Sequence, residues 1–153
     1  MSKWELETTD EDEKEFILSE EVAEKEVKNF CRHYRINVAK FTNKNVQDSL
    51  NQALDVLQDG YRRGLLENNE DDTGFNVIQH LVKDGPKGGT PITYRELAAK
   101  HKRSMDGYES TVIYERQQAL LGVLSGLGKD VIGNFKGYDL HVSEALGSVF
   151  FLA

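Results

Sequence analysis

The sequence predicts a mainly α (α+β) fold, in which a helical domain carries one small β-hairpin. Three observations lead to this fold class. Apolar residues recur at helical spacing toward both ends of the chain. An alternating apolar segment bordered by Gly and Pro lies between them, and hydrophobic residues make up 39% of the 153 positions. A chain of this length and composition can bury one hydrophobic core.

Residues 1–15 predict an acidic, flexible N-terminal arm, because they are polar and lack a sustained apolar period. Residues 1–29 contain eleven Asp or Glu against four Lys, which accounts for the whole formal charge of −7. An acidic end repels a polyanion and argues against nucleic acid as a partner.

Residues 16–66 predict a helical hairpin. Ser19 can cap a helix over 20–34, whose first turn is acidic. A second helix is expected over 44–63, where glycines mark its end. The apolar stripe that these helices share is formed by Phe30, Tyr34, Leu54, Leu57 and Tyr61.

Residues 67–153 predict a β-hairpin followed by helices, and we expect them to form one domain with the helical hairpin. The segment 67–74 is interpreted as a polar break. Alternation in the segment that follows it, together with Gly/Pro turn residues, predicts two strands within 75–96.

The last third of the chain is expected to be helical over 109–124 and 129–135. Asp139 is expected to cap a final helix. The apolar residues of that helix recur at the spacing of one buried face.

The stretch Gly122-Val-Leu-Ser-Gly-Leu-Gly-Lys-Asp resembles a phosphate-binding loop at first sight. A Walker loop requires Gly five residues before the Gly-Lys pair, and a hydroxyl residue after it. Val123 and Asp130 occupy those two positions. These glycines are therefore predicted to separate helices, and no nucleotide site is expected.

No catalytic, cofactor or metal site is expected, so the chain is interpreted as a non-enzyme. Its four histidines, His33, His80, His101 and His141, are isolated from other residues at metal-ligand spacing. Cys31 lies on an apolar helix stripe and is expected to be buried and inert.

An alternative function is suggested by residues 93–116, which can be read as a helix-turn-helix-like element of a DNA-binding regulator. Thr93 and Glu96 could form a capping box, and basic residues predominate over 95–103. However, charged residues stand at 102 and 103, where the turn favours a small and an apolar residue.

Residues 75–152 resemble the small tail assembly chaperones of long-tailed bacteriophages and prophages. Short degenerate motifs carry this resemblance along the C-terminal half of the chain. They are Arg95-Glu96, Ala98 or Ala99, Met105-Asp106, Ser125-Gly126-Leu127, Val131-Ile132, Gly137-Tyr138-Asp139 and Phe151-Leu152. The N-terminal helical hairpin and the acidic arm depart from the family pattern.

The resemblance implies a non-enzymatic function in the cytoplasm of a bacterial host. The expected partners are a helical tape-measure protein, which such chaperones keep soluble, and the tail-tube protein that polymerises around it. No membrane partner is expected, because no apolar run approaches the length of a membrane span. One cysteine and no visible secretory signal also fit a cytoplasmic protein.

The client-binding surface is expected on the final helix, where apolar residues can contact a helical client. It would comprise Val142, Leu146, Val149, Phe150, Phe151 and Leu152. The alternative is that this stripe and the N-terminal stripe pack against each other as core. An apolar stripe that stays exposed would also allow the chain to associate with itself.

Overall fold

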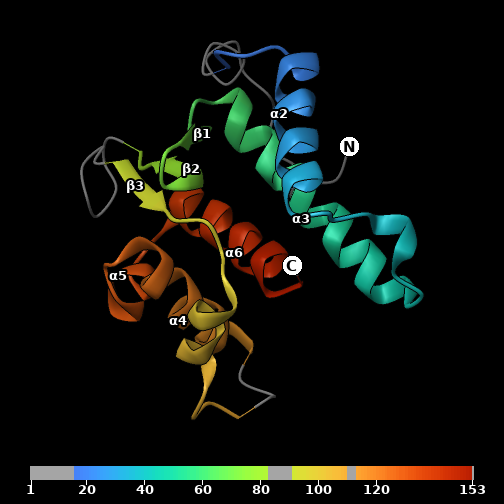
Figure 1. Cartoon of the computed structure of the whole chain (residues 1–153). Helices are drawn as coiled ribbons and strands as arrows, with labels where there is room; N and C mark the ends of the chain where they lie inside the picture. Colours follow the sequence, from blue (N-terminus) through green and yellow to red (C-terminus); the bar gives the residue numbers. More distant parts are fainter. Residues whose placement is uncertain (1–15, 83–90, 110–112, 153) are drawn as a thin grey trace, which may run out of the picture.

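The computed structural model describes residues 16–82, 91–109 and 113–152. It is mainly helical with one small antiparallel sheet, as the sequence predicts (Figure 1). The acidic arm and the turn between the predicted strands lie outside the described residues. The elements are α2 (Glu20–His33), η1 (Val38–Lys40), α3 (Lys44–Arg62), β1 (Leu66–Asp71), β2 (Gly74–His80), β3 (Pro91–Tyr94), η2 (Ala99–Met105), α4 (Ile113–Ser125), α5 (Lys129–Gly133) and α6 (Gly137–Leu152).

Helices α2 and α3 form the predicted hairpin, and side chains cap both of their N-termini. Ser19 accepts a hydrogen bond from the main-chain N–H of Val22 at 3.2 Å. Asn43 accepts one from the N–H of Asn45 at 2.8 Å. Each helix buries one apolar face. The buried residues are Ala23, Val27 and Phe30 on α2, and Leu50, Ala53, Leu57, Gly60 and Tyr61 on α3.

The sheet has three strands in the order β1-β2-β3, and all neighbours are antiparallel. The expected hairpin is present as β2 and β3. The interpretation of 67–74 as a polar break was wrong, because most of this segment forms strand β1 and its turn into β2. Asn, Asp and Glu have low β propensity, so pairing with β2 stabilises a strand that its own sequence does not favour.

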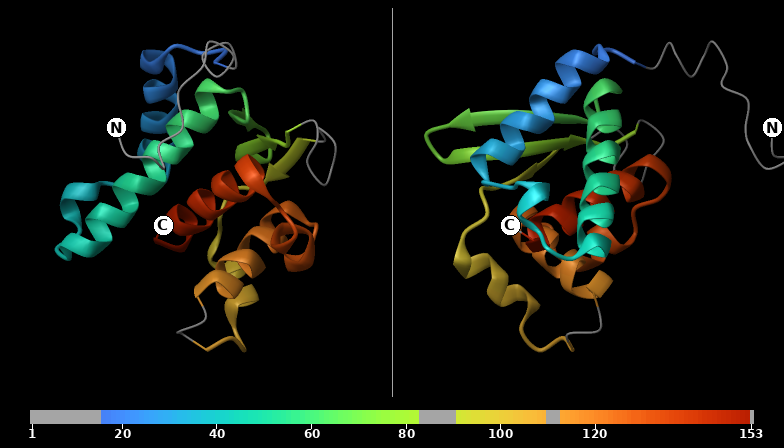
Figure 2. Two further views of the ribbon diagram at one scale, coloured as in Figure 1. Left: turned by 180° about the vertical axis from the view of Figure 1, so that it is seen from behind. Right: turned by 90° about the vertical axis from the view of Figure 1, so that its right-hand side faces the viewer.

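One face of the sheet packs on the helices, whereas the residues of the other face, apart from Asn76, are exposed or half-buried. Phe75, Val77, Ile92 and Tyr94 are buried on the inner face. On the outer face, His80 lies 3.6 Å from the carboxylate of Glu67. The β1–β2 hairpin extends beyond the helices, so that its tip is exposed on both faces (Figure 2).

Helix α4 approaches α5 closely enough to require glycine at position 122. A Cβ atom there would lie 2.5 Å from the main-chain nitrogen of Lys129 and 2.6 Å from the carbonyl carbon of Gly128. Gly126 and Gly128 have φ values of +75° and +87° between the two helices. These glycines therefore connect closely packed helices, in agreement with the prediction from their spacing.

Helix α6 runs through the centre of the molecule and contacts both α3 and α4 (Figure 1). Val142, Leu146, Val149 and Phe150 on this helix are at most 2% exposed. They belong to one hydrophobic core that includes residues from α2 through α6. Within the described part of the chain, no helix has the length and apolar character needed to cross a bilayer.

Asp139 does not cap α6, in contrast to the expectation from the sequence. The helix begins at Gly137, and Asp139 lies in its first turn with only 1% of its surface exposed. Its Oδ1 atom accepts a hydrogen bond from the N–H of Val82 at 2.9 Å. Its main-chain carbonyl accepts one from the side chain of Gln79 at 3.1 Å. Asp139 therefore connects the start of α6 to the segment that follows β2.

The second carboxylate oxygen of Asp139 is buried and has no hydrogen-bond partner among the described residues. Burial raises the pKa of this carboxyl group above its usual value, although the bond from Val82 acts in the opposite direction. A folded-state pKa above the unfolded-state value means that stability is lost as the pH rises through the folded-state pKa.

We therefore expect Asp139→Asn to be more stable than the parent chain at pH 7, because it removes the buried charge. The difference in unfolding free energy should shrink toward pH 4, where the parent carboxyl group also becomes neutral. Urea unfolding at both pH values measures it. Asp130→Asn on exposed α5 is the control, and equal pH profiles for the parent and Asp139→Asn would contradict this account.

Candidate functional site

The structure places most of the predicted client-binding residues in the core. Leu146, Val149 and Phe150 are fully buried, and Val142 is 2% exposed. Phe151 and Leu152 are half-buried and pack against the core from its edge. A client could reach Leu146, Val149 or Phe150 only if the helices around α6 moved apart.

The two predicted apolar stripes pack on each other, as the alternative interpretation holds. The ring of Phe150 lies 5.6 Å from the ring of Phe30 and 5.6 Å from that of Tyr34. Tyr34 also accepts a hydrogen bond from the N–H of Leu97 at 3.1 Å, and burial raises the pKa of its hydroxyl. These contacts join α2, α6 and the segment after β3.

A groove follows the outer side of the α3–α6 pair. It consists of two adjoining hollows of about 280 and 310 Å³, which share Val56 and His141. The two helices run antiparallel along the groove, so that the end of α3 lies beside the start of α6. Its lining residues are Ser49, Gln52, Ala53, Asp55, Val56, Asp59, Tyr114, Tyr138, His141, Val142, Glu144, Ala145 and Ser148.

Small and apolar side chains form the floor of this α3–α6 groove. Ala53, Val142 and Ala145 are buried, and Val56 is half-buried between them. Of the six predicted client-binding residues, only Val142 lines the groove. Ala53 and Ala145 were not among the predicted site residues, because alanine on an amphipathic helix carries no signal beyond core packing.

Two exposed tyrosines border the α3–α6 groove. Tyr114, at the start of α4, is 67% exposed, and Tyr138, in the first turn of α6, is 41% exposed. The guanidinium of Arg63 lies 4.7 Å from the centre of the Tyr138 ring and forms a 2.8 Å ion pair with Asp59. Tyrosine provides a large contact area with few rotatable bonds, which suits it to protein interfaces.

The charged groups that line the α3–α6 groove are carboxylates. Asp55, Asp59 and Glu144 line it, whereas no lysine or arginine does. Arg63 partly neutralises Asp59 at one end. The groove therefore combines an apolar floor with an acidic rim.

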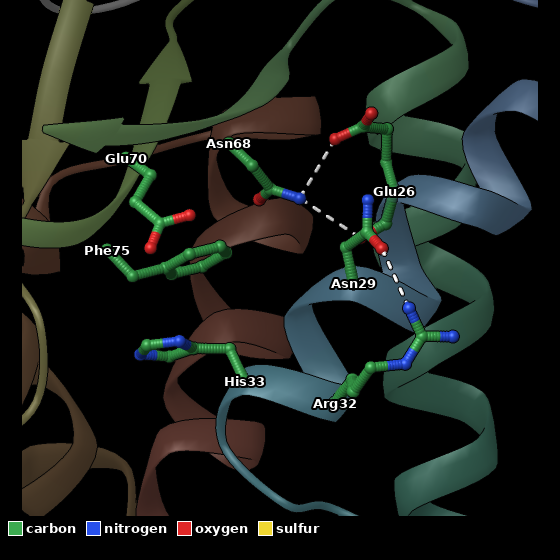
Figure 3. Close-up of a pocket in the computed structure, with 7 residues that line it drawn as sticks. All are labelled: Glu26, Asn29, Arg32, His33, Asn68, Glu70 and Phe75. Carbon is green, nitrogen blue, oxygen red and sulfur yellow. Dashed lines mark hydrogen bonds between the residues drawn. The ribbon is translucent and has the colours of Figure 1, made fainter.

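A second hollow, of about 520 Å³, lies between α2 and the exposed part of the β1–β2 hairpin (Figure 3). We call it the hairpin groove. It is lined by Glu26, Asn29, Arg32, His33, Asn68, Glu70 and Phe75. The rings of His33 and Phe75 stack with centroids 4.4 Å apart and planes inclined by 14°.

Hydrogen bonds fix part of the hairpin groove. The Asn68 amide donates to the main-chain carbonyl and to the carboxylate of Glu26, both at 3.0 Å (Figure 3). The hydroxyl of Tyr61 also bonds to Asn68. His33 contacts the carboxylate of Glu96. The bonds of Asn68 hold β1 to α2 and α3, so Asn68 has a structural function, whereas the His33–Glu96 contact joins α2 to the segment after β3.

Reactive groups are sparse in the described parts of the chain. No group of three or more His, Cys, Asp or Glu residues could hold a metal ion among residues 16–82, 91–109 and 113–152. Cys31 is half-buried rather than fully buried, and burial raises the pKa of its thiol. A raised pKa disfavours the thiolate, which is the nucleophilic form.

Among the described residues 93–109, the first helix of the expected helix-turn-helix element does not form. Thr93 and Tyr94 belong to strand β3, and Ala99–Met105 forms a 3-10 helix rather than an α-helix. Thr93 therefore caps no helix. The basic residues of η2 are exposed on a short irregular segment and not on a first helix that would support a recognition helix.

No protein-family model, curated protein or solved structure matches this chain. Its function therefore has to be inferred from the geometry and charge of its own surfaces. The α3–α6 groove, unlike the hairpin groove, contains a residue predicted to bind a client.

Phe150 and Phe151 should separate core packing from surface packing on α6. We expect Phe150→Ala to lower the unfolding free energy by about 3–5 kcal/mol, as for other buried aromatic residues. Phe151→Ala should cost about 1 kcal/mol, because Phe151 is half-buried and stacks with Arg116 at 5.4 Å. Denaturant unfolding of both variants measures the difference, and equal losses would contradict the assignment of Phe150 to the core.

Proposed function

We propose that this chain is a non-enzymatic chaperone in phage or prophage tail assembly. In this function it binds a long helical client of the tape-measure type and keeps it soluble while tail-tube subunits polymerise. The client helix lies in the α3–α6 groove. The setting is the cytoplasm of a bacterial host.

The observation that carries this proposal is the pairing of an apolar floor with exposed tyrosines along two antiparallel helices. Ala53 and Ala145 are small enough to let another backbone approach closely. Tyr114 and Tyr138 can close over its sides. An amphipathic helix that places its apolar face in a groove is a common mode of peptide recognition.

The length of the groove defines how much client it can hold. On α3 its lining residues extend from Ser49 to Asp59. Ten residue steps of an α-helix correspond to about 15 Å, or nearly three turns. One chain therefore covers a short helical segment, and a long client would take up several copies along its length.

The acidic rim selects the chemistry of the client helix. Asp55 lines the groove from α3 and Glu144 lines it from α6. A client with lysine or arginine beside its apolar stripe would place positive charge near both carboxylates. Such complementarity mainly raises the association rate and excludes wrong partners.

The resemblance to tail assembly chaperones supports the same surface. Its Gly137-Tyr138-Asp139 motif forms the first turn of α6. Tyr138 borders the groove and Asp139 fixes the start of the helix by its bond to Val82. One motif would thus both position α6 and present a side chain to the client.

Co-expression with a long helical protein of the tape-measure type tests the proposal. The parent chain should increase the soluble fraction of that protein. The double variant Tyr114→Ala with Tyr138→Ala should lose most of this effect, at about 1–2 kcal/mol of binding free energy for each tyrosine. The control is Val123→Ala with Leu127→Ala, which truncates two side chains that are 42% and 40% exposed but outside the groove.

Equal loss of solubilisation in both double variants would contradict docking in this groove. A client that is no more soluble with the parent chain than without it would contradict the chaperone function. A salt-sensitive shift of duplex DNA, lost when Lys100 and Arg103 are both replaced by alanine, would instead favour the DNA-binding regulator.

A further inference from the structure

Among the residues that the structure describes, β1 is an edge strand. It pairs with β2 on one side, and no described strand pairs with its other side. The β1–β2 hairpin also extends beyond the helices that cover the rest of the sheet (Figure 2). An edge of this kind is a template on which an extended polypeptide can add a further strand.

The register shows which main-chain groups point outward from β1. Leu65 accepts a hydrogen bond from the N–H of His80 at 2.9 Å, so these two residues form a hydrogen-bonded pair. Hydrogen-bonded and non-hydrogen-bonded pairs alternate along an antiparallel ladder. Asn68 and Glu70, which lie opposite Val77 and Phe75, therefore direct their N–H and C=O groups away from β2. No hydrogen bond to another described residue uses these main-chain groups.

The same register places the hairpin groove directly beside this edge. Side chains alternate between the two faces of a strand, and Asn68 and Glu70 are on the face that lines the groove (Figure 3). In an added strand, the residues opposite Asn68 and Glu70 would place their side chains on this face as well. An added strand would thus bring every second side chain to the groove.

The charge around the edge defines the occupant. Residues 66–73 contain four acidic residues and no basic ones. Glu26 adds a carboxylate from α2 on the other side of Asn68 (Figure 3). Among the residues that line the groove, Arg32 alone is a lysine or arginine. Its guanidinium donates a hydrogen bond to Asn29 at 3.3 Å and extends away from Glu70 (Figure 3). Glu70 has no hydrogen bond or ion pair with another described residue.

Two other occupants conflict with this charge. Residues 1–15 of the chain contain seven acidic residues and two lysines, so the edge would repel them. A second copy that paired β1 with β1 in antiparallel register, with Asn68 opposite Glu70, would place Glu67 opposite Asp71 at both ends of the pair. Like charges directly opposite each other destabilise a strand pair.

We propose that β1 and the hairpin groove bind an extended, basic segment of another polypeptide. The segment adds a fourth strand to the sheet by pairing with the outward main-chain groups of Asn68 and Glu70. One of its lysine or arginine side chains enters the groove between Glu70 and Glu26, where it can also contact the stacked rings of His33 and Phe75. This site is separate from the α3–α6 groove and does not depend on the chaperone function.

A synthetic peptide tests the proposal with the full chain. The probe is a fluorescently labelled, end-capped octapeptide in which lysine and arginine alternate with valine. A matched peptide carries glutamate in place of each basic residue. A third peptide keeps the basic sequence but has alternate main-chain nitrogens methylated, which removes the N–H groups that would pair with β1. Fluorescence anisotropy measures the dissociation constants.

Glu70→Lys and Glu67→Lys form a matched pair of variants. Both residues are exposed on β1 and both substitutions change the net charge equally, but only Glu70 faces the groove. The proposal expects the basic peptide to bind, the glutamate and methylated peptides to bind weakly or not at all, and Glu70→Lys to weaken binding about tenfold more than Glu67→Lys. Circular dichroism confirms that both variants remain folded.

Four results would overturn the proposal. Equal weakening by Glu70→Lys and Glu67→Lys would indicate attraction to general negative charge. Unchanged binding of the methylated peptide would exclude strand addition. Absence of binding by the basic peptide, or dimerisation of the chain through β1, would exclude the proposed occupant.

Discussion

The burial of α6 is the constraint on which the rest of the structure depends. A helix that is apolar on nearly all sides has to be covered by other elements all around. The N-terminal hairpin supplies Phe30 and Tyr34 against Phe150, and α3 and α4 pack along the length of the helix. Both halves of the sequence thus contribute to one core. Asp139 holds the N-terminal end of α6 in place, because its carboxylate accepts a hydrogen bond from the N–H of Val82 in the segment after β2.

This constraint separates the packing residues of α6 from those that another protein can reach. Leu146, Val149 and Phe150 are fully buried in the core and have no surface left for a partner. What remains on the surface is the side of α6 that runs beside α3, where alanines and serines keep the two helices close and leave the α3–α6 groove above them. The proposed client surface therefore contains fewer apolar residues of α6 than the stripe that the sequence predicts. It consists of small floor residues and bordering tyrosines, with carboxylates on both helices.

The sequence predicts the helices well because their apolar residues recur at regular intervals and Ser19 caps the first of them. It does not predict β1, since Leu-Glu-Asn-Asn-Glu-Asp has neither alternation nor β propensity, and its pairing with β2 and the bonds of Asn68 to α2 come from distant residues. The spacing of α6 correctly indicates a buried face. Spacing alone, however, cannot distinguish a face that the same chain buries from a face that another protein covers on binding. Tyr114 and Tyr138 carried no periodic signal, and only the folded arrangement brings them to the same groove.

Hydroxyl-radical footprinting of the chain, alone and bound to its helical client, tests the central claim most directly. The method reports the solvent exposure of individual side chains, and Tyr114 and Tyr138 are exposed whereas Tyr61 and Tyr94 are buried in the free chain. Docking in the α3–α6 groove predicts that the client slows oxidation of Tyr114 and Tyr138, while the exposed Leu127, which follows α4 and does not line the groove, stays as reactive as before. Protection of Leu127 with unchanged oxidation of both tyrosines would contradict it.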